Sequence, residues 1–222
     1  MQQIEESQMI SAIERAANRM IELRDVLNRL DAAVGDGDTG ITVSKCGAGI
    51  KEYLDSNKPD GNMGTYLIGL GMAVNRAASS SLGTLIATAL MRAGKEAQDL
   101  SSLDGPTIAK MLTAAAVGIQ ERGKAKPGDK TIVDALHPAA EAFDAAIRSN
   151  ARLEEAAQQM LEAARKGRDS VIASRSKIGR AAWVGERTEN QPDPGTVLLV
   201  EIIEAVLEAK HSQPGSTIAP DI

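Results

Sequence analysis

The chain has 222 residues, a formal net charge of −5 and one cysteine. The negative charge argues against a general nucleic-acid-binding protein, and a single cysteine excludes a disulfide within the chain, which favours a reducing cytoplasm. The N-terminal MQQIEESQMI does not resemble a signal peptide, and no uncharged apolar run approaches the length of a membrane span. We therefore expect a soluble, cytoplasmic protein without a membrane partner.

Apolar residues at helical spacing predict eight α-helices and no strand. The first helix covers residues 9–30, where Met9, Met20 and Leu27 fall on one face. Residues 1–210 are expected to form a single domain, and 211–222, with two prolines and a glycine, a loose C-terminal tail. The other seven helices are expected over residues 43–53, 63–78, 82–94, 106–121, 131–148, 151–172 and 195–209.

Short connectors between these helices favour antiparallel neighbours. The predicted fold class is therefore all-α, an eight-helix antiparallel up-and-down barrel or bundle. In such a bundle the connectors after the first, third, fifth and seventh helices lie at the same end. They hold three aspartates, a serine run, a basic loop and an arginine-rich loop, so one rim should carry the functional site. These connectors are residues 31–39, 79–81, 122–130 and 174–194.

The sharpest motif is the run GDGDTG over residues 35–40, with Asp31 just upstream. It fits the dinucleotide fingerprint GxGxxG, but a helix precedes it instead of a strand, and its aspartates would repel a pyrophosphate. Carboxylates suit Mg²⁺, which binds one or two of them beside waters and substrate phosphates. The following helix also offers N-terminal amides to a phosphate. We predict a magnesium site here, with a surface Asp-Gly turn as the alternative.

Three further segments of this rim carry weaker signals. Residues 79–81 precede a helix and are either phosphate contacts or an ordinary N-cap. Residues 118–125 fall one residue short of a P-loop, and Gly123 is better interpreted as the end of a helix. The arginines of residues 174–194 would either stabilise charge on a phosphoryl group or remain solvated.

Nearly the whole chain, from about residue 5 to 209, resembles the nucleotide-binding L subunit of dihydroxyacetone kinases. The resemblance rests on four segments in the same order: LDAAVGDGDTG, RGKAKPGDKT, SKIGRAAWVGERT and QPDPGT. It implies an eight-helix antiparallel barrel with Mg-ADP or Mg-ATP at one end, acting as a glycerone kinase subunit in glycerol metabolism. The small ketose would be bound covalently to a histidine of a separate K subunit, which would be the required partner.

The resemblance also implies the site residues. The metal ligands would be Asp31, Asp36 and Asp38. The catalytic residues would be Asp36 and Arg180, with Lys130 as a further candidate for stabilising charge on the transferring phosphoryl group. The nucleotide-binding residues would be Thr39, Gly40, Ile41, Thr42, Ser80, Ser81, Gly123, Ile132, Arg180, Asp193 and Gly195.

Two positions depart from the family pattern. Thr39 stands where members coupled to the phosphotransferase system often have His, and SSSLGT replaces the usual Gly-Ala-Ser-Gly-Pro-like loop. The phosphate donor therefore stays open between a phosphohistidine protein of that system, which would rephosphorylate bound ADP, and exchanging ATP. The ketose, dihydroxyacetone or erythrulose, and the oligomeric state, monomer or homodimer, are open too.

Two other functions compete with this one. The first is the nucleotide domain of a fatty-acid-kinase-like enzyme, which shares the Asp-Gly-Asp-Thr-Gly core. The second is a nucleotide-bound regulatory module without turnover of its own. A lipid-carrying partner would favour the first, and nucleotide binding without turnover beside a K-type subunit would favour the second.

Overall fold

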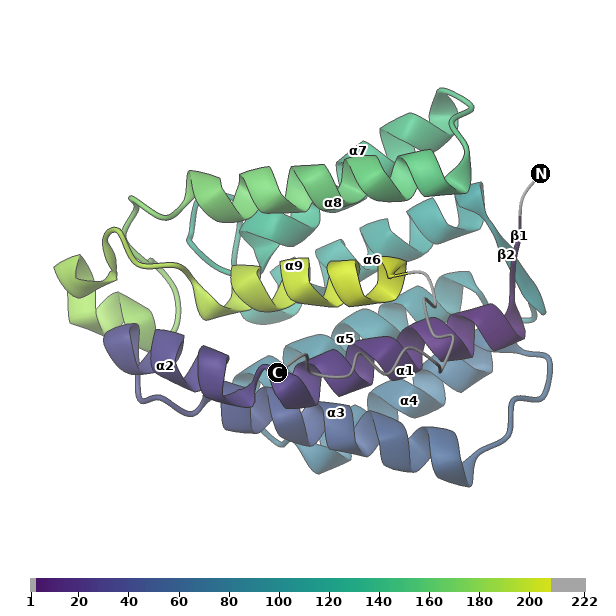
Figure 1. Ribbon diagram of the computed structural model, residues 1–222, viewed down its shortest axis with the longest axis horizontal. Helices are drawn as coiled ribbons and strands as arrows, with labels where there is room; N and C mark the ends of the chain where they lie inside the picture. The colour runs from purple at the N-terminus through teal and green to yellow at the C-terminus, as the bar shows by residue number, and fades with distance from the viewer. Residues whose placement is uncertain (1–2, 209–222) are drawn as a thin grey trace, which may run out of the picture.

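The computed structural model describes residues 3–208, and over this range the chain is almost entirely helical (Figure 1). A 3₁₀-helix, η1 (Arg180–Thr188), and a two-stranded antiparallel sheet of β1 (Gln3–Glu5) and β2 (Ser102–Asp104) complete the described elements. The α-helices are α1 (Glu6–Glu22), α2 (Arg24–Val34), α3 (Thr39–Ser56), α4 (Met63–Ala77), α5 (Ser81–Glu96), α6 (Gly105–Gly123), α7 (Val133–Arg148), α8 (Leu153–Ser170) and α9 (Pro194–Leu207).

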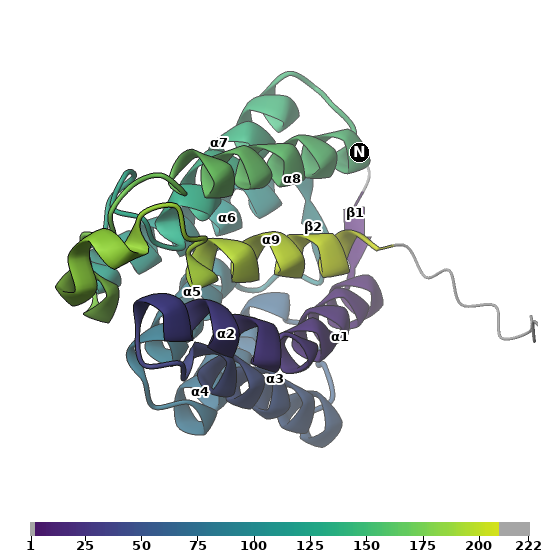
Figure 2. The same cartoon turned by 60° about the vertical axis from the view of Figure 1, so that its left-hand side comes forward.

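Eight of these helices close into a ring. From α3 to α9 each helix packs against the next in chain order, and α1 packs against both α3 and α9. Neighbours run antiparallel, so that α3, α5, α7 and α9 all begin at the end of the molecule where α2 and η1 lie (Figures 1 and 2). The predicted all-α, eight-helix antiparallel barrel is therefore confirmed.

The predicted first helix, residues 9–30, is two helices in the structure. The chain bends at Leu23, although hydrogen bonding continues through the bend, from Leu23 N–H to Arg19 O at 3.0 Å and from Leu27 N–H to Leu23 O at 2.9 Å. Leu23 and Leu27 are both buried, so the apolar spacing continues across the bend and gives no sign of it. As a result α2 leaves the ring and lies beside α3 and η1 at the rim.

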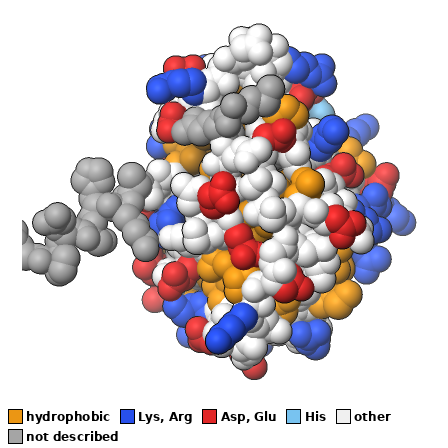
Figure 3. Space-filling view, turned by 90° about the vertical axis from the view of Figure 1, so that its right-hand side faces the viewer, with side chains coloured by type: hydrophobic (Ala, Val, Ile, Leu, Met, Phe, Trp, Pro, Cys, Tyr) orange, Lys and Arg blue, Asp and Glu red, His pale blue; other side chains and the backbone are white. Residues whose placement is uncertain are grey.

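The expectation of no strand is wrong at one place. Ile4 pairs with Leu103 in the β1–β2 sheet, and each strand is too short for an alternating pattern to be recognised. The sheet lies at the end opposite the rim, where acidic and basic side chains are interspersed (Figure 3). This end therefore resembles an ordinary solvated surface.

The apolar core has two main parts that α9 joins. One part is formed by α1 to α5 and includes Leu198 of α9, while the other is formed by α6 to α9 and includes Val200 and Ile203. Because neighbouring residues of α9 pack into both parts, this helix joins the two halves of the ring on one side, and the packing of α5 against α6 joins them on the other. None of the described helices is long and apolar enough to cross a membrane. The expected tail, 211–222, lies outside the described residues, so the boundary at residue 210 stays a prediction.

Arg15 is one of the residues that link α1 to α9. Its Nε donates to Ala205 O at 2.9 Å and its Nη2 to Val206 O at 2.7 Å, carbonyls that the end of α9 leaves without helical partners. We expect Arg15→Met to lower the free energy of unfolding in urea by about 1–3 kcal/mol, the range for charge-assisted hydrogen bonds. Arg29→Met, on an exposed position of α2, is the control and should change it by less than about 0.5 kcal/mol. Equal effects of the two substitutions would contradict this role.

Candidate functional site at the rim of the barrel

A cavity of about 750 Å³ opens at the rim where α3, α5, α7 and α9 begin. All four connectors that the sequence placed at one end contribute to its wall, which agrees with the predicted active rim. Twelve of the predicted site residues line it, although they lie as far apart in the chain as residues 31 and 195. These are Asp31, Asp36, Asp38, Thr39, Thr42, Ser80, Ser81, Gly123, Ile132, Arg180, Asp193 and Gly195.

Gly40 and Ile41 are the two predicted residues that the structure does not bring to the cavity wall. A Cβ at Gly40 would overlap the backbone carbonyl oxygen of Arg24, so glycine lets α3 begin directly against α2. The Ile41 N–H donates to Asn28 Oδ1 at 3.1 Å, and its side chain is exposed. Both residues hold the first turn of α3 against α2.

The three aspartates gather where α2 gives way to α3, and one oxygen from each lies within 4.8 Å of the others. Asp31 is buried, and its Oδ2 accepts hydrogen bonds from the N–H groups of Asp38, at 2.9 Å, and Thr39, at 3.1 Å. Gly37 has φ of 78°, a conformation that side-chain-bearing residues rarely adopt. These features fold the loop tightly around the Asp31 carboxylate and keep all three acids together.

The chemistry of this donor set suits a divalent cation. Three carboxylates supply hard oxygen ligands, and Mg²⁺ needs only one or two of them beside phosphates and waters. The Arg180 guanidinium contacts the Asp36 carboxylate, and its Nη1 lies 3.9 Å from Asp38 Oδ2. The negative charge of the three aspartates thus attracts a positive group, the Arg180 guanidinium, to the cluster.

Four helix N-termini also face this cavity. The first turns of α3, α5 and α9 place Thr39, Ser81 and Gly195 on its wall, and Ile132, the N-cap residue of α7, lies there too. Helix N-termini attract anions through their free amides and the positive end of the helix dipole. Ser80 is the N-cap of α5, because its Oγ accepts from Gly83 N–H at 3.1 Å. The N-cap interpretation of the serine run thus holds for Ser80, whose hydroxyl hydrogen can still be donated into the cavity.

Sequence reasoning missed the apolar part of the wall. Leu82, Leu85, Ile178 and Pro194 line the cavity beside the polar residues. Leu82 and Leu85 are three residues apart at the start of α5, a spacing that puts them on one helical face. This pattern could have been recognised, but it looks the same as that of core leucines.

Lys130 lies on the wall but does not present its charge to it. Its Nζ donates to the carbonyls of Ile172 and Ser174, both at 2.8 Å, and of Thr188 at 2.5 Å. An ammonium has three hydrogens, so these bonds use all of them. In this structure Lys130 therefore binds the backbone between α8 and α9 and does not offer its charge to a transferring phosphoryl group.

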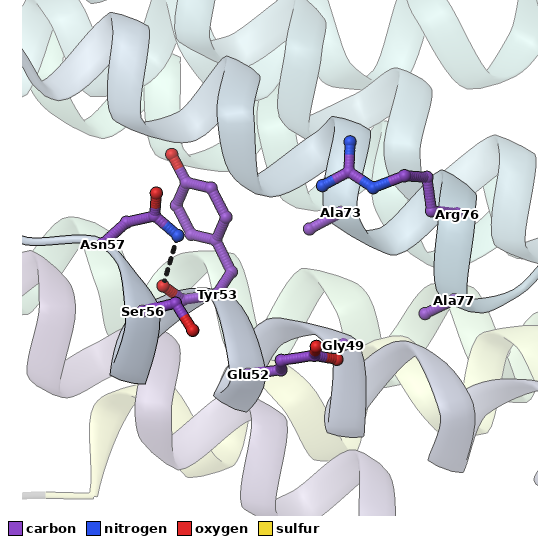
Figure 4. A pocket seen from close by; sticks show the side chains of 8 residues that line it. All are labelled: Gly49, Glu52, Tyr53, Ser56, Asn57, Ala73, Arg76 and Ala77. Carbon is purple, nitrogen blue, oxygen red and sulfur yellow. Dashed lines mark hydrogen bonds between the residues drawn. The ribbon is translucent and has the colours of Figure 1, made fainter.

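A second cavity, of about 380 Å³, lies between α3 and α4. Figure 4 shows Tyr53 of α3 and Arg76 of α4 on its walls. Burial raises the pKa of the Tyr53 hydroxyl, and the negative charge of Asp60 adds to this effect. None of the residues predicted from the sequence for the functional site lines this cavity.

Asp193 is the N-cap of α9, and its Oδ2 accepts from Thr196 N–H at 2.8 Å. Burial raises the pKa of its carboxyl from 3.8 to about 7, while the Thr196 N–H opposes this shift and the negative charge of Asp134 adds to it. The folded protein then holds a proton on Asp193 over a pH range where the unfolded chain has lost it. Stability should therefore fall as the pH rises from 3.8 to about 7.

We expect Asp193→Asn to flatten this part of the stability profile, since asparagine keeps the cap but does not titrate. Thermal unfolding in buffers across this range would measure it. Asp104→Asn, at the N-cap of α6, is the matched control. Hydrogen bonds from Thr107 lower the pKa of Asp104, so its ionised form adds stability that is lost when the pH falls through that lowered value. The Asp104→Asn protein should therefore show the same decrease in stability between pH 3.8 and about 7 as the wild type. An unchanged profile in Asp193→Asn would contradict the assignment.

Residues 33–208 match the DAK2 domain. The chain belongs to the DAK2 domain family. This DAK2 chain is 29% identical over 204 residues to triokinase/FMN cyclase of Homo sapiens, covering 92% of the chain and 35% of that protein. It is 27% identical over 206 residues to the PEP-dependent dihydroxyacetone kinase, ADP-binding subunit DhaL of Escherichia coli, covering 92% of the chain and 98% of that subunit. The resemblance inferred from the four motif segments is thereby confirmed.

The DAK2 fold is also found among solved structures. The dihydroxyacetone kinase from C. freundii in complex with AMP-PNP and Mg²⁺ superposes with a TM-score of 0.70 at 24% identity, covering 93% of this chain and 34% of that one. This likeness supports the barrel architecture. The DAK2 chain spans about a third of the length of the first curated relatives it matches, at 35% of each.

Proposed function

We propose that the chain is the Mg-nucleotide-binding component of a kinase that phosphorylates dihydroxyacetone or a similar small ketose. The observation that carries this proposal is one cavity in which three clustered carboxylates, four helix N-termini and Arg180 meet. A nucleotide di- or triphosphate with its magnesium is a ligand that needs both kinds of group, acids for the metal and amides for the phosphates. The names of the relatives, a triokinase and a dihydroxyacetone kinase subunit, support the same class.

In this proposal Asp31, Asp36 and Asp38 hold Mg²⁺, which when bound neutralises phosphate charge. Asp31 is fixed in advance by the amides of Asp38 and Thr39, so little reorganisation would be needed on binding. Its other oxygen stays available as a ligand. The cluster would therefore be a rigid electrostatic partner for the phosphate chain.

The remaining wall residues would orient the nucleotide. Hydroxyls of Thr39, Thr42, Ser80 and Ser81 would donate to phosphate oxygens, together with the first amides of α3 and α5. Arg180 would move its guanidinium from Asp36 to the transferring phosphoryl group, where its charge is needed. The apolar side of the cavity would contact the nucleobase. Gly123, Ile132, Asp193 and Gly195 would shape the wall around it.

The ketose would be held by a partner subunit or by another domain. No histidine is among the residues that line the cavity, so the described part of the chain offers none for holding a ketose there. The phosphate donor, ATP or a phosphohistidine protein, would determine whether the nucleotide stays bound.

Two measurements test the proposal. Calorimetry should show Mg-ADP or Mg-ATP binding, and mixing the protein with a ketose-binding subunit, dihydroxyacetone or erythrulose, and ATP should yield the phosphorylated ketose. Mass spectrometry of the denatured protein would distinguish the two phosphate donors. Stoichiometric ADP would favour rephosphorylation of bound ADP by a phosphohistidine protein, and an empty site would favour exchanging ATP. A protein that binds neither nucleotide would refute the function. Binding without turnover would favour a regulatory module, and capture of a lipid-carrying protein a fatty-acid-kinase-like role.

A further inference from the structure

The connector between α8 and α9, residues 171–193, brings Gly179, Arg180 and Asp193 to the cavity. Apart from η1 it has no regular structure, so its backbone carbonyls need partners from elsewhere in the molecule. The position of Arg180 therefore depends on what holds this connector in place.

The ammonium of Lys130 binds both legs of the connector, that is, the segment that leaves α8 and the segment that returns towards α9. Ile172 and Ser174, whose carbonyls it contacts, lie on the leg that leaves α8, and Thr188 lies on the leg that returns towards α9. Residues 175–187, with Arg180 among them, form the loop between the two attachment points. The Lys130 side chain thus links the two ends of this loop at its base.

The backbone of Lys130 indicates that its side chain is needed there. Its φ is 60°, in the left-handed region that glycine adopts far more easily. Its side chain is also buried, at 2% exposure for the residue, although a buried ammonium is unfavourable unless it is fully hydrogen-bonded. Burial lowers the pKa of Lys130, and the negative charges of Asp193 and Glu189 oppose that shift. Glycine at this position would avoid both the unfavourable backbone conformation and the burial of a charge. It could not, however, join the two ends of the connector.

Further contacts around Lys130 hold the same loop. Thr188 is fully buried, and its Oγ1 accepts from Ser176 N–H at 3.0 Å and donates to Gly185 O at 2.8 Å. The carbonyl of Asp129, next to Lys130, accepts from Lys177 N–H at 3.0 Å. The loop is therefore tied to the turn before α7 at its base, while the side chain of Arg180 is 71% exposed.

We propose that Lys130 is a positioning residue, which holds the loop 175–187 closed so that Arg180 stays beside the aspartate cluster. Although Lys130 lines the cavity, its ammonium acts on Arg180 only through the backbone carbonyls that it binds. The consequence for nucleotide binding rests on the function proposed above, whereas closure of the loop does not. The two parts can thus be tested separately.

The first test uses the ligand-free protein and two matched variants. Lys130→Met removes the buried ammonium. Lys177→Met makes the same chemical change at a side chain that is 60% exposed, and its ion pair with Asp129 Oδ1, at 4.0 Å, should contribute little because the lysine faces solvent. An arginine-specific protease can cut the loop after Arg175, Arg180 and Arg187. We expect cleavage there to become about tenfold faster or more in Lys130→Met and to stay at the wild-type rate in Lys177→Met, with unchanged helix content. Wild-type rates in both variants would overturn the proposal.

Trp183 offers a second readout of the same opening. It is the only tryptophan of the chain, it lies inside the loop and it is 91% exposed. Its fluorescence anisotropy should fall in Lys130→Met and not in Lys177→Met, because only the first substitution frees the loop. Identical anisotropies of all three proteins would count against the proposal.

The second test measures Mg-ADP affinity well below the melting temperature. We expect Lys130→Met to weaken binding about tenfold or more and Lys177→Met to leave it unchanged. A purely structural lysine would lower the melting temperature without changing the affinity of the folded protein, and that result would overturn the positioning role. A wild-type protein that fails to bind Mg-ADP would instead refute the proposed function, and the protease test would still decide the closure of the loop.

A measurement on the wild type covers the case in which Lys130→Met does not fold. An ammonium bonded to three carbonyls exchanges its hydrogens with water slowly. Nitrogen-15 NMR should therefore show one lysine ammonium signal with exchange about tenfold slower, or more, than that of exposed lysines. Fast exchange of every lysine ammonium would overturn the proposal.

Discussion

Asp36→Ala is expected to weaken Mg-nucleotide binding by about 100-fold or more, and to reduce phosphoryl transfer below detection, while the helix content stays unchanged. The substitution removes one of three clustered carboxylates and also the carboxylate that Arg180 contacts. The Asp36 side chain is 45% exposed, so its loss leaves no buried cavity. Calorimetry with Mg-ADP, the reconstituted kinase assay and circular dichroism would measure the three quantities.

Asp25→Ala is the matched control for this experiment. Asp25 is an exposed acid in the first turn of α2, the helix that ends at the aspartate cluster. The Asp25→Ala protein should bind Mg-ADP as the wild type does. If Asp36→Ala also kept wild-type affinity, the assignment of this cluster as the metal site would be wrong.

Gly40→Ala is expected to lower the free energy of unfolding by about 3 kcal/mol, at the upper end for overpacking. The added methyl group would overlap the Arg24 carbonyl oxygen, which belongs to the backbone of α2 and cannot rotate away as a side chain can. The first turn of α3 would have to move, and the aspartate loop with it. Urea unfolding would give the stability, and Mg-ADP affinity would report the displacement of the loop.

Gly123→Ala provides the comparison. A Cβ at Gly123 would lie 3.4 Å from Leu85 Cδ2, an ordinary contact with a side chain. Alanine is also the better helix former, by about 0.5–1 kcal/mol, so the free energy of unfolding should stay the same or rise. A stable Gly40→Ala protein would show that α2 and α3 can separate without cost, contrary to the packing described here.

The barrel was predictable from the sequence, and so was the gathering of the predicted site residues at one rim. Helical spacing in eight segments, together with short connectors, was sufficient because an up-and-down ring follows from the order of its helices. The same argument brought Asp31, Ser80 and Asp193 to one rim without any knowledge of contacts. The motif GDGDTG then predicted a metal site, and this assignment stays a prediction although the structure brings the three aspartates together.

Several features could not be predicted, for physical reasons that differ. The bend at Leu23 leaves the apolar pattern intact. Gly40 lies within a motif that suggests ligand contact, although its lack of a Cβ serves helix packing. Lys130 adopts a left-handed conformation that sequence rules reserve for glycine or asparagine. Its three carbonyl partners lie 42 to 58 residues away, in a segment without periodicity.

The end of the barrel opposite the rim has a practical consequence for studying the protein. Connectors such as residues 57–62 lie there, on the side away from the cavity. The only native thiol is Cys46, which is buried, and burial raises its pKa to about 12, so it should resist alkylating dyes. A cysteine introduced at the exposed Lys58 would thus be labelled selectively. A fluorophore there could follow assembly with a partner at the rim without blocking it, and the same point would serve to immobilise the protein on a sensor surface.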